Sequence, residues 1–184
     1  MRSNEPEDQG SAKSKPIPAK GEVALLDYAI IGRYWSKAKP SIMGPYMMNG
    51  FGFPASAGSY RFDAERKIVD RLIRGMSVNS DGTVLDLGSG VGFWAEYFAQ
   101  RFGKVIAVES SVPLYEAMRM RCRQYANATL VNDDVLAFRP GGSYSLIFLG
   151  GILMYLNQED VVALLEGSVP ISVEKQKWRN LRVA

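Results

Sequence analysis

The sequence predicts an α/β protein with a mostly parallel central sheet and helices on both faces. Two observations carry this prediction. Short apolar stretches alternate with helical patterns from Thr83 onward, and a glycine-rich turn follows the first apolar stretch. Strands that alternate with helices are joined by crossovers, which makes them parallel. Hydrophobic residues form 47% of the 184 residues, which is enough to bury one core of ordinary domain size.

The N-terminal part is expected to hold a leader and a helix. Residues 1–21 are rich in Pro, Ser, Lys and Glu and show no hydrophobic period, so they predict a disordered leader. Apolar residues then recur at helical spacing, which predicts a helix over Glu22–Ser36. Pro40 ends that pattern.

A loop and a second helix follow. Residues 41–60 mix turn formers with large apolar side chains, so we expect an ordered loop that covers a pocket. Asp63 is the expected N-cap of the second helix, and Gly75 stands where a helix ends. Residues 22–80 together predict an N-terminal helical cap.

The alternating region, residues 81–170, is expected to form the core, followed by a basic tail over 171–184. Its expected elements are strand Thr83–Leu87, helix Phe93–Phe102, strand Lys104–Val108, helix Pro113–Tyr125, strand Thr129–Asn132, strand Ser145–Leu149, and a helix that opens at Asn157 and ends at Gly167. Pro113 suits a first helical turn, where its missing N–H costs nothing.

Composition excludes several kinds of site. The chain has no histidine and one cysteine, which excludes a Ser-His-Asp triad, an imidazole zinc site and an internal disulfide. The net charge is +3, and the basic excess lies in the two ends, so the sequence predicts no nucleic-acid partner. It has neither an apolar run of about 20 residues nor a signal-peptide pattern, which predicts a cytoplasmic protein with no membrane partner.

The segment Thr83-Val-Leu-Asp-Leu-Gly-Ser-Gly-Val-Gly-Phe93 is the most informative motif. Three glycines in a turn between a strand and a helix let the backbone approach a ligand closely. A dinucleotide site needs a small residue at the third position of G-x-G-x-x-G, where Phe93 stands. An acid at Asp86 also suits a cationic group better than a phosphate. These features favour a nucleoside with a positive group over a dinucleotide.

Four motifs in order resemble those of class I S-adenosylmethionine-dependent methyltransferases, which have a Rossmann-like three-layer sandwich fold. They are V-L-D-L-G-S-G-V-G, then V-I-A-V-E ending at Glu109, then N-D-D-V around Asp134, then the apolar run Leu146–Leu156. The resemblance implies S-adenosylmethionine as cofactor and these cofactor-binding residues: Asp86, Gly88, Ser89, Gly90, Gly92, Phe93, Glu109, Ser110, Asp133, Asp134, Val135 and Gly150.

The resemblance also implies a role for each group. Asp86 and the turn would lie at the methionine end, and Glu109 would accept hydrogen bonds from both ribose hydroxyls. Asp134 would meet the adenine edge, with Asp133 as the alternative. Gly150 would bring backbone near the methyl donor. The competing interpretation is that Asp86 and Glu109 only cap the following helices, and that Asp133 and Asp134 are ordinary acids of a loop after a strand.

The acceptor is expected to be a small molecule, bound by aromatic residues of the N-terminal cap and of the segment after the fourth strand. The candidate substrate residues are Tyr34, Trp35, Tyr46, Phe51 and Tyr155. These side chains could instead pack only on the sheet edge. No general base is identified, and the arginines Arg119, Arg121 and Arg123 are interpreted as a solvated helix face.

The chain departs from the family after the fourth strand. The family has seven strands, whereas the residues beyond Leu149 have room for one more at most, so we expect a C-terminally shortened fold. The fourth strand would then be an exposed edge, which favours a homodimer. A non-catalytic protein that binds cofactor or a partner chain is the first alternative function, and a nicotinamide-dependent oxidoreductase is the second.

Overall fold

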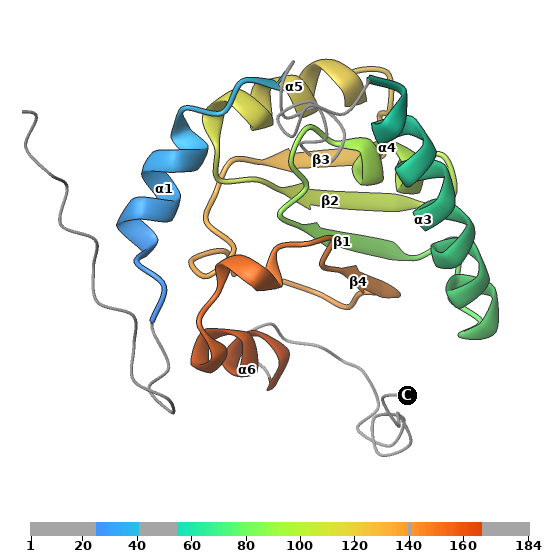
Figure 1. Ribbon diagram of the computed structural model, residues 1–184. Coiled ribbons are helices and arrows are strands. Elements are labelled where there is room, and N and C mark those ends of the chain that lie inside the picture. The colour runs from blue at the N-terminus through green and yellow to red at the C-terminus, as the bar shows by residue number, and fades with distance from the viewer. Residues whose placement is uncertain (1–24, 41–54, 140, 167–184) are drawn as a thin grey trace, which may run out of the picture.

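The computed structural model describes residues 25–40, 55–139 and 141–166, and Figure 1 shows their arrangement. The elements in chain order are α1 (Tyr28–Ser36), α3 (Ala55–Gly75), β1 (Thr83–Leu87), α4 (Phe93–Ala99), β2 (Lys104–Val108), α5 (Val112–Cys122), β3 (Ala128–Val131), β4 (Leu146–Phe148), a short 3-10 helix at Leu153–Tyr155, and α6 (Gln158–Glu166).

The strands of the described residues form one parallel sheet in the order β3-β2-β1-β4. Leu85 is in register with Ile106 of β2 and with Ile147 of β4. The strands β2 and β3 are therefore added in order on one side of β1, and β4 is added on its other side. This arrangement confirms the predicted fold class, and it leaves β1 and β2 at the centre with their carboxyl ends side by side.

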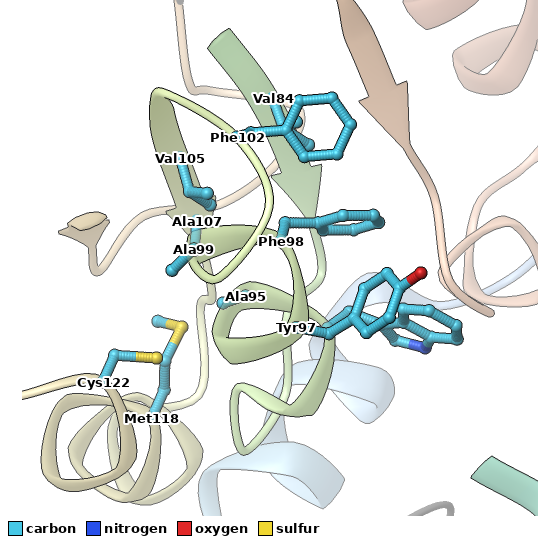
Figure 2. Close-up of a cluster of buried hydrophobic side chains, with 11 residues drawn as sticks. Val84, Ala95, Tyr97, Phe98, Ala99, Phe102, Val105, Ala107, Met118 and Cys122 are labelled. Atoms are coloured by element: carbon cyan, nitrogen blue, oxygen red, sulfur yellow. The ribbon is translucent and has the colours of Figure 1, made fainter. Parts of the chain in front are cut away.

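Each face of the sheet has its own hydrophobic core. On one face, Val84, Val105 and Ala107 pack against α4 and α5, with Phe98 of α4 fully buried among them, as Figure 2 shows. Partly buried residues of α3 pack against the outside of this cluster. On the other face, Leu85, Leu87 and Val108 pack with Leu164 of α6. The alternation follows from the strand period of two, and helices do cover both faces, as predicted.

The observed helices differ from the predicted ones at their ends. Asp27 caps α1, since its side chain accepts from the N–H groups of Ala29 (2.9 Å) and Ile30 (3.2 Å). The predicted helix start at Glu22 is outside the described residues, and Leu25 and Leu26 are not helical. In α3, Asp63 is an interior residue, not a cap, and pairs with Arg66 at 3.3 Å. Of the loop expected over 41–60, residues 55–60 belong to α3, and residues 41–54 lie outside the described residues.

The expected N-terminal cap is two separate helices. In Figure 1, α1 stands beside the carboxyl ends of the strands, between α5 and α6, whereas α3 packs outside α4. The predicted leader 1–21 and tail 171–184 lie outside the described residues, and the division into 22–80 and 81–170 stays a prediction. None of the described helices is long and apolar enough to cross a membrane.

Candidate functional site

The glycine turn between β1 and α4 has a backbone that only glycine adopts without strain. Gly88, Gly90 and Gly92 have φ values of 74°, 56° and 82°. A Cβ on Gly92 would lie 2.7 Å from Met118 Cγ, so glycine here lets α5 approach the turn. A Cβ on Gly90 would have no neighbour within 4 Å. Gly90 therefore faces open space, which is the room that a ligand needs.

Backbone and carboxylate groups of β2 hold this turn. The N–H groups of Gly88 and Ser89 both donate to the Val108 carbonyl, at 2.9 and 3.0 Å. The Gly90 N–H donates to Glu109 Oε2 at 2.8 Å. Glu109 Oε1 accepts from the Ser111 N–H at 2.8 Å. Each carboxylate oxygen of Glu109 thus binds one backbone amide, and the side chain joins the glycine turn to the start of α5.

Asp86 is the second carboxylate of the site and lies at the end of β1. It is 1% exposed, and its Oδ2 atom has no hydrogen-bond partner. Burial raises the pKa of Asp86 to about 7, the hydrogen bond from Ser89 lowers it, and the nearby Glu109 raises it further. An unpartnered buried oxygen is costly unless a ligand supplies a donor or a positive charge. This atom fits a cationic ligand group beside the turn.

Burial also raises the pKa of Glu109, while its hydrogen bonds from the amides of Ser111, Gly90 and Ser110 lower it. The segment around it is fixed by the side-chain amide of Asn132. Asn132 Nδ2 donates to the carbonyls of Glu109 (2.7 Å) and Ser110 (3.1 Å). Asn132 is the first residue of the N-D-D-V motif, but no role was predicted for it there from the sequence.

The acids after β3 have local hydrogen bonds. Asp134 Oδ1 accepts from the Leu136 N–H and Asp133 Oδ1 from the Asp134 N–H, both at 2.8 Å. These bonds close a turn, so both acids have local partners in the loop after the strand. The Val135 side chain packs into the core beneath α6. A ligand role for this segment stays a prediction.

The aromatic candidates do meet at the carboxyl edge. The Trp35 ring lies edge-on to Tyr155, with centroids 5.3 Å apart, and to Tyr34 at 5.2 Å. The Ser111 hydroxyl donates to the Trp35 carbonyl at 2.7 Å, which fixes this end of α1 at the start of α5. Tyr46 and Phe51 lie outside the described residues.

The other end of α1 is bound to α6. The Tyr28 hydroxyl donates to the Asp160 carboxylate and accepts from the Asn157 N–H at 2.9 Å. Asn157 Oδ1 also accepts from the Leu26 N–H at 2.7 Å. Helix α1 therefore bridges α5 and α6 across the carboxyl edge of the sheet. We call this helix and its two anchors the strap.

The remaining predicted site residues lie around the turn. Phe93 begins α4, and its ring contacts Phe62 of α3 with centroids 5.5 Å apart. A Cβ on Gly150 would lie 2.6 Å from the Phe148 ring, so packing favours glycine there. Ser110 is exposed next to Glu109.

Comparison with known proteins agrees with this architecture. Residues 84–169 match the family described as methyltransferase domain. A curated relative, ribosomal RNA small subunit methyltransferase A of Dehalococcoides mccartyi (strain CBDB1), is 29% identical over 154 residues, which cover 77% of this chain and 53% of the relative. An rRNA adenine N-6-methyltransferase of Bacillus licheniformis is 27% identical over 71 residues, 39% of this chain and 25% of that one. The chain spans about half the length of the first relative and about a quarter of the second.

Solved structures show the same fold at low identity. A Leishmania major structure described as a SAM-dependent methyltransferase has a TM-score of 0.58 at 16% identity, covering 76% of this chain and 54% of its own. The DhpI-SAH complex has a TM-score of 0.56 at 20% identity, covering 73% and 58%.

The curated relatives correct one expectation from the sequence. Their names give ribosomal RNA as substrate, so the prediction of no nucleic-acid partner is wrong. The prediction averaged charge over the whole middle of the chain, and such an average hides local clusters. Arg33, Lys37 and Lys39 are all exposed beside the aromatic residues of the strap. The glycine turn, the paired carboxylates, the parallel sheet and the family match agree: residues 84–169 match a methyltransferase domain and have the Rossmann-like fold of class I methyltransferases.

Proposed function

We propose that this protein transfers a methyl group from S-adenosylmethionine to an acceptor. The single observation that carries the proposal is the unpartnered, buried Oδ2 of Asp86 beside a glycine turn whose Gly90 faces open space. A sulfonium nucleoside with an ammonium group would supply a positively charged partner for Asp86, which has none at its Oδ2 atom. When bound, S-adenosylmethionine supplies an electrophilic methyl carbon and a neutral thioether leaving group.

Glu109 is well suited to the ribose. Each of its oxygens already accepts one backbone N–H, at 2.8 Å, and a carboxylate oxygen can accept a further bond. Its remaining acceptor capacity would receive the vicinal hydroxyl groups of the ribose. Because the same side chain holds the glycine turn, ribose and turn would be positioned together. Asp133 or Asp134 with Val135, and Gly150, are proposed for the adenine and methyl-donor ends on the family resemblance.

The chain's contribution to the reaction is to hold the reactants in line and to exclude water. Tyr155 faces the strap. Its pKa is raised mainly by burial and to a smaller extent by the nearby Tyr34. Its hydroxyl is therefore protonated at neutral pH and is a hydrogen-bond donor, not a base. An amine acceptor with a free lone pair needs no base before the transfer, and its proton can pass to water afterwards.

For the acceptor we propose an RNA base. Trp35, Tyr34 and Tyr155 form an aromatic group on which a flat base can stack, and such stacking with nearby cations is the usual form of single-strand recognition. Arg33, Lys37 and Lys39 are exposed on the same segment and have no ion pair within the described residues. A small molecule, the acceptor expected from the sequence, is the second candidate.

Calorimetric titration with S-adenosylhomocysteine tests the cofactor. We expect micromolar binding by the unmodified chain and much weaker binding by Glu109→Gln, which keeps one acceptor oxygen but loses the charge. Glu109→Gln also loses one of the two turn contacts, because its amide nitrogen cannot accept an N–H, whereas Glu109→Ala loses both contacts and every ribose acceptor, so its binding should be weaker still. Tighter binding of NAD than of S-adenosylhomocysteine would contradict the proposal.

Transfer of a labelled methyl group tests the acceptor. Ribosomal RNA and a set of small amines are incubated separately with labelled cofactor. RNA labelling should fall with rising salt, and Arg33→Gln/Lys37→Gln/Lys39→Gln should weaken it. The matched control, Lys67→Gln/Arg71→Gln/Arg74→Gln on α3, should have little effect. Labelling of amines alone would assign the small-molecule acceptor.

A further inference from the structure

One arginine of α5 contacts the glycine turn directly. Arg121 Nε donates to the Val91 carbonyl at 3.0 Å, and its Nη1 donates to Glu96 Oε2 at 3.0 Å. Its guanidinium carbon lies 3.7 Å from the centre of the Phe93 ring. The Arg121 side chain is therefore in contact with one residue of the turn, Val91, and two residues of α4, Phe93 and Glu96. The expectation that Arg121 belongs to a solvated helix face is wrong.

The contact to Val91 acts on the part of the turn that faces the ligand. Val91 lies between Gly90, which faces open space, and Gly92, whose N–H donates to the Ser89 carbonyl at 2.9 Å. Holding the Val91 carbonyl fixes the plane of the Val91–Gly92 peptide, because a peptide unit is rigid. Gly92, on one side of this peptide, would otherwise give it greater freedom to rotate.

An arginine is suited to this position. Its planar guanidinium directs Nε and Nη1 to two different acceptors while its face lies on an aromatic ring. A lysine ammonium is a single point and cannot keep this set of contacts. Glu96 balances the charge and also accepts from the Tyr125 hydroxyl at 3.4 Å. Arg121 and Glu96 are both partly buried, with side chains 31% and 24% exposed.

A neighbouring arginine on the same helix provides the contrast. Arg119 pairs at 3.0 Å with Glu116, one turn away on α5, and these side chains are 61% and 50% exposed. Exposed pairs of this kind contribute little to stability. Among the described residues, Arg119 bonds Glu116 and not the turn, so it has the same chemistry without the position.

We propose that Arg121 is a positioning residue for the cofactor: it holds the Gly88–Gly92 turn in its ligand-binding form before the ligand arrives. The inference rests on the proposed function, because the turn is there the site of the methionine end. Without Arg121 the turn has other conformations, and binding must then offset the cost of selecting one.

Titration with S-adenosylhomocysteine, with a melting curve for each variant, tests this role. Arg121→Gln should bind about tenfold more weakly, since a charge-assisted hydrogen bond to the turn is lost. Arg121→Lys should recover only part of the affinity, Glu96→Gln should weaken it, and Arg119→Gln should match the unmodified chain. In turnover, Arg121→Gln should raise the KM for S-adenosylmethionine and leave the KM for the acceptor unchanged.

A purely structural role would give a different result. It would lower the melting temperature of Arg121→Gln while affinity per folded molecule stayed unchanged, and that outcome would overturn the proposal. An equal loss in Arg119→Gln would do the same. If the unmodified chain itself fails to bind, the proposed function fails and this inference with it. If it binds and Arg121→Gln binds equally well, only the positioning role is lost.

Discussion

The carboxyl of Asp86 links ligand binding to stability. Its pKa is about 7 in the folded chain, raised first by burial, against an ordinary value of 3.8. Between these values the folded chain holds a proton that the unfolded chain has lost. The free energy of unfolding should therefore fall as pH rises from about 4 to about 7. The group costs stability at neutral pH, as expected for a ligand-binding carboxylate.

Asp86→Asn should remove this pH dependence. The amide does not ionise, so the variant should unfold at higher urea than the unmodified chain at pH 8 and at similar urea at pH 4.5. Its affinity for S-adenosylmethionine should fall strongly at pH 8 and much less at pH 4.5, where Asp86 of the unmodified chain is already protonated. Urea titrations at the two pH values measure the first effect, with the exposed Asp63→Asn as control. If the urea midpoint of Asp86→Asn changed between the two pH values as much as that of the unmodified chain, another group would be responsible for the pH dependence.

Two glycines of the turn should respond differently to alanine. Gly90→Ala adds a Cβ into open space, so it costs roughly 1–2 kcal/mol for its left-handed backbone and should abolish ligand binding. Gly92→Ala has the same backbone cost and in addition forces its Cβ against Met118, so it should be the less stable variant. Thermal melting ranks stability, and calorimetry measures binding. Unimpaired binding by Gly90→Ala would place the ligand elsewhere.

Site residues at strand ends could be predicted, whereas their supporting contacts could not. Asp86 and Glu109 follow apolar stretches, and parallel strands bring their carboxyl ends together. Asn132 and Arg121 act through bonds to backbone carbonyls on other elements. Such bonds depend on how α5 and β3 pack, and no local pattern encodes that packing.

At the scale of elements, the strap is held by few polar contacts. Tyr28 bonds both Asp160 and Asn157, and the Ser111 hydroxyl holds the opposite end. Tyr28→Phe keeps the ring and removes both hydroxyl contacts. We expect faster trypsin cleavage at Arg33 and Lys37 because α1 then detaches more often. Tyr60→Phe on α3, where Tyr60 is 75% exposed, is the control and should cleave at the unmodified rate.

Element boundaries were predictable where the hydrophobic period is strong. β1 and β2 have the expected bounds, since apolar stretches between turn signals define them. Helix α3 begins earlier than expected, at Ala55. The sequence misplaced its start because Asp63 resembles an N-cap and residues 56–59, Ser-Ala-Gly-Ser, carry no apolar helical period. Tertiary packing of α3 on α4 overrides that weak local preference.

For the whole molecule, the proposed ligand should raise thermal stability. At a concentration of 100 times its Kd, a ligand that binds only the folded chain adds about 2.7 kcal/mol. For a chain of this size that corresponds to a rise in Tm of about 5–10 °C. Differential scanning fluorimetry with S-adenosylhomocysteine measures the rise, and Asp86→Asn should show almost none. A rise of equal size in the variant would mean that the nucleoside binds away from β1.

The contact between the strap and the start of α6 also sets the order in which the protein can fold during synthesis. Leu26 and Asn157 are separated by 131 positions, yet they bond each other directly. A ribosome needs on the order of ten seconds to synthesise that interval. During that time α1 is outside the ribosome while its anchor on α6 does not exist, although β1, β2 and the glycine turn are already made. In a nascent chain, the carboxylates of Asp86 and Glu109 would thus be placed first, and the aromatic residues of the strap would reach their final position last.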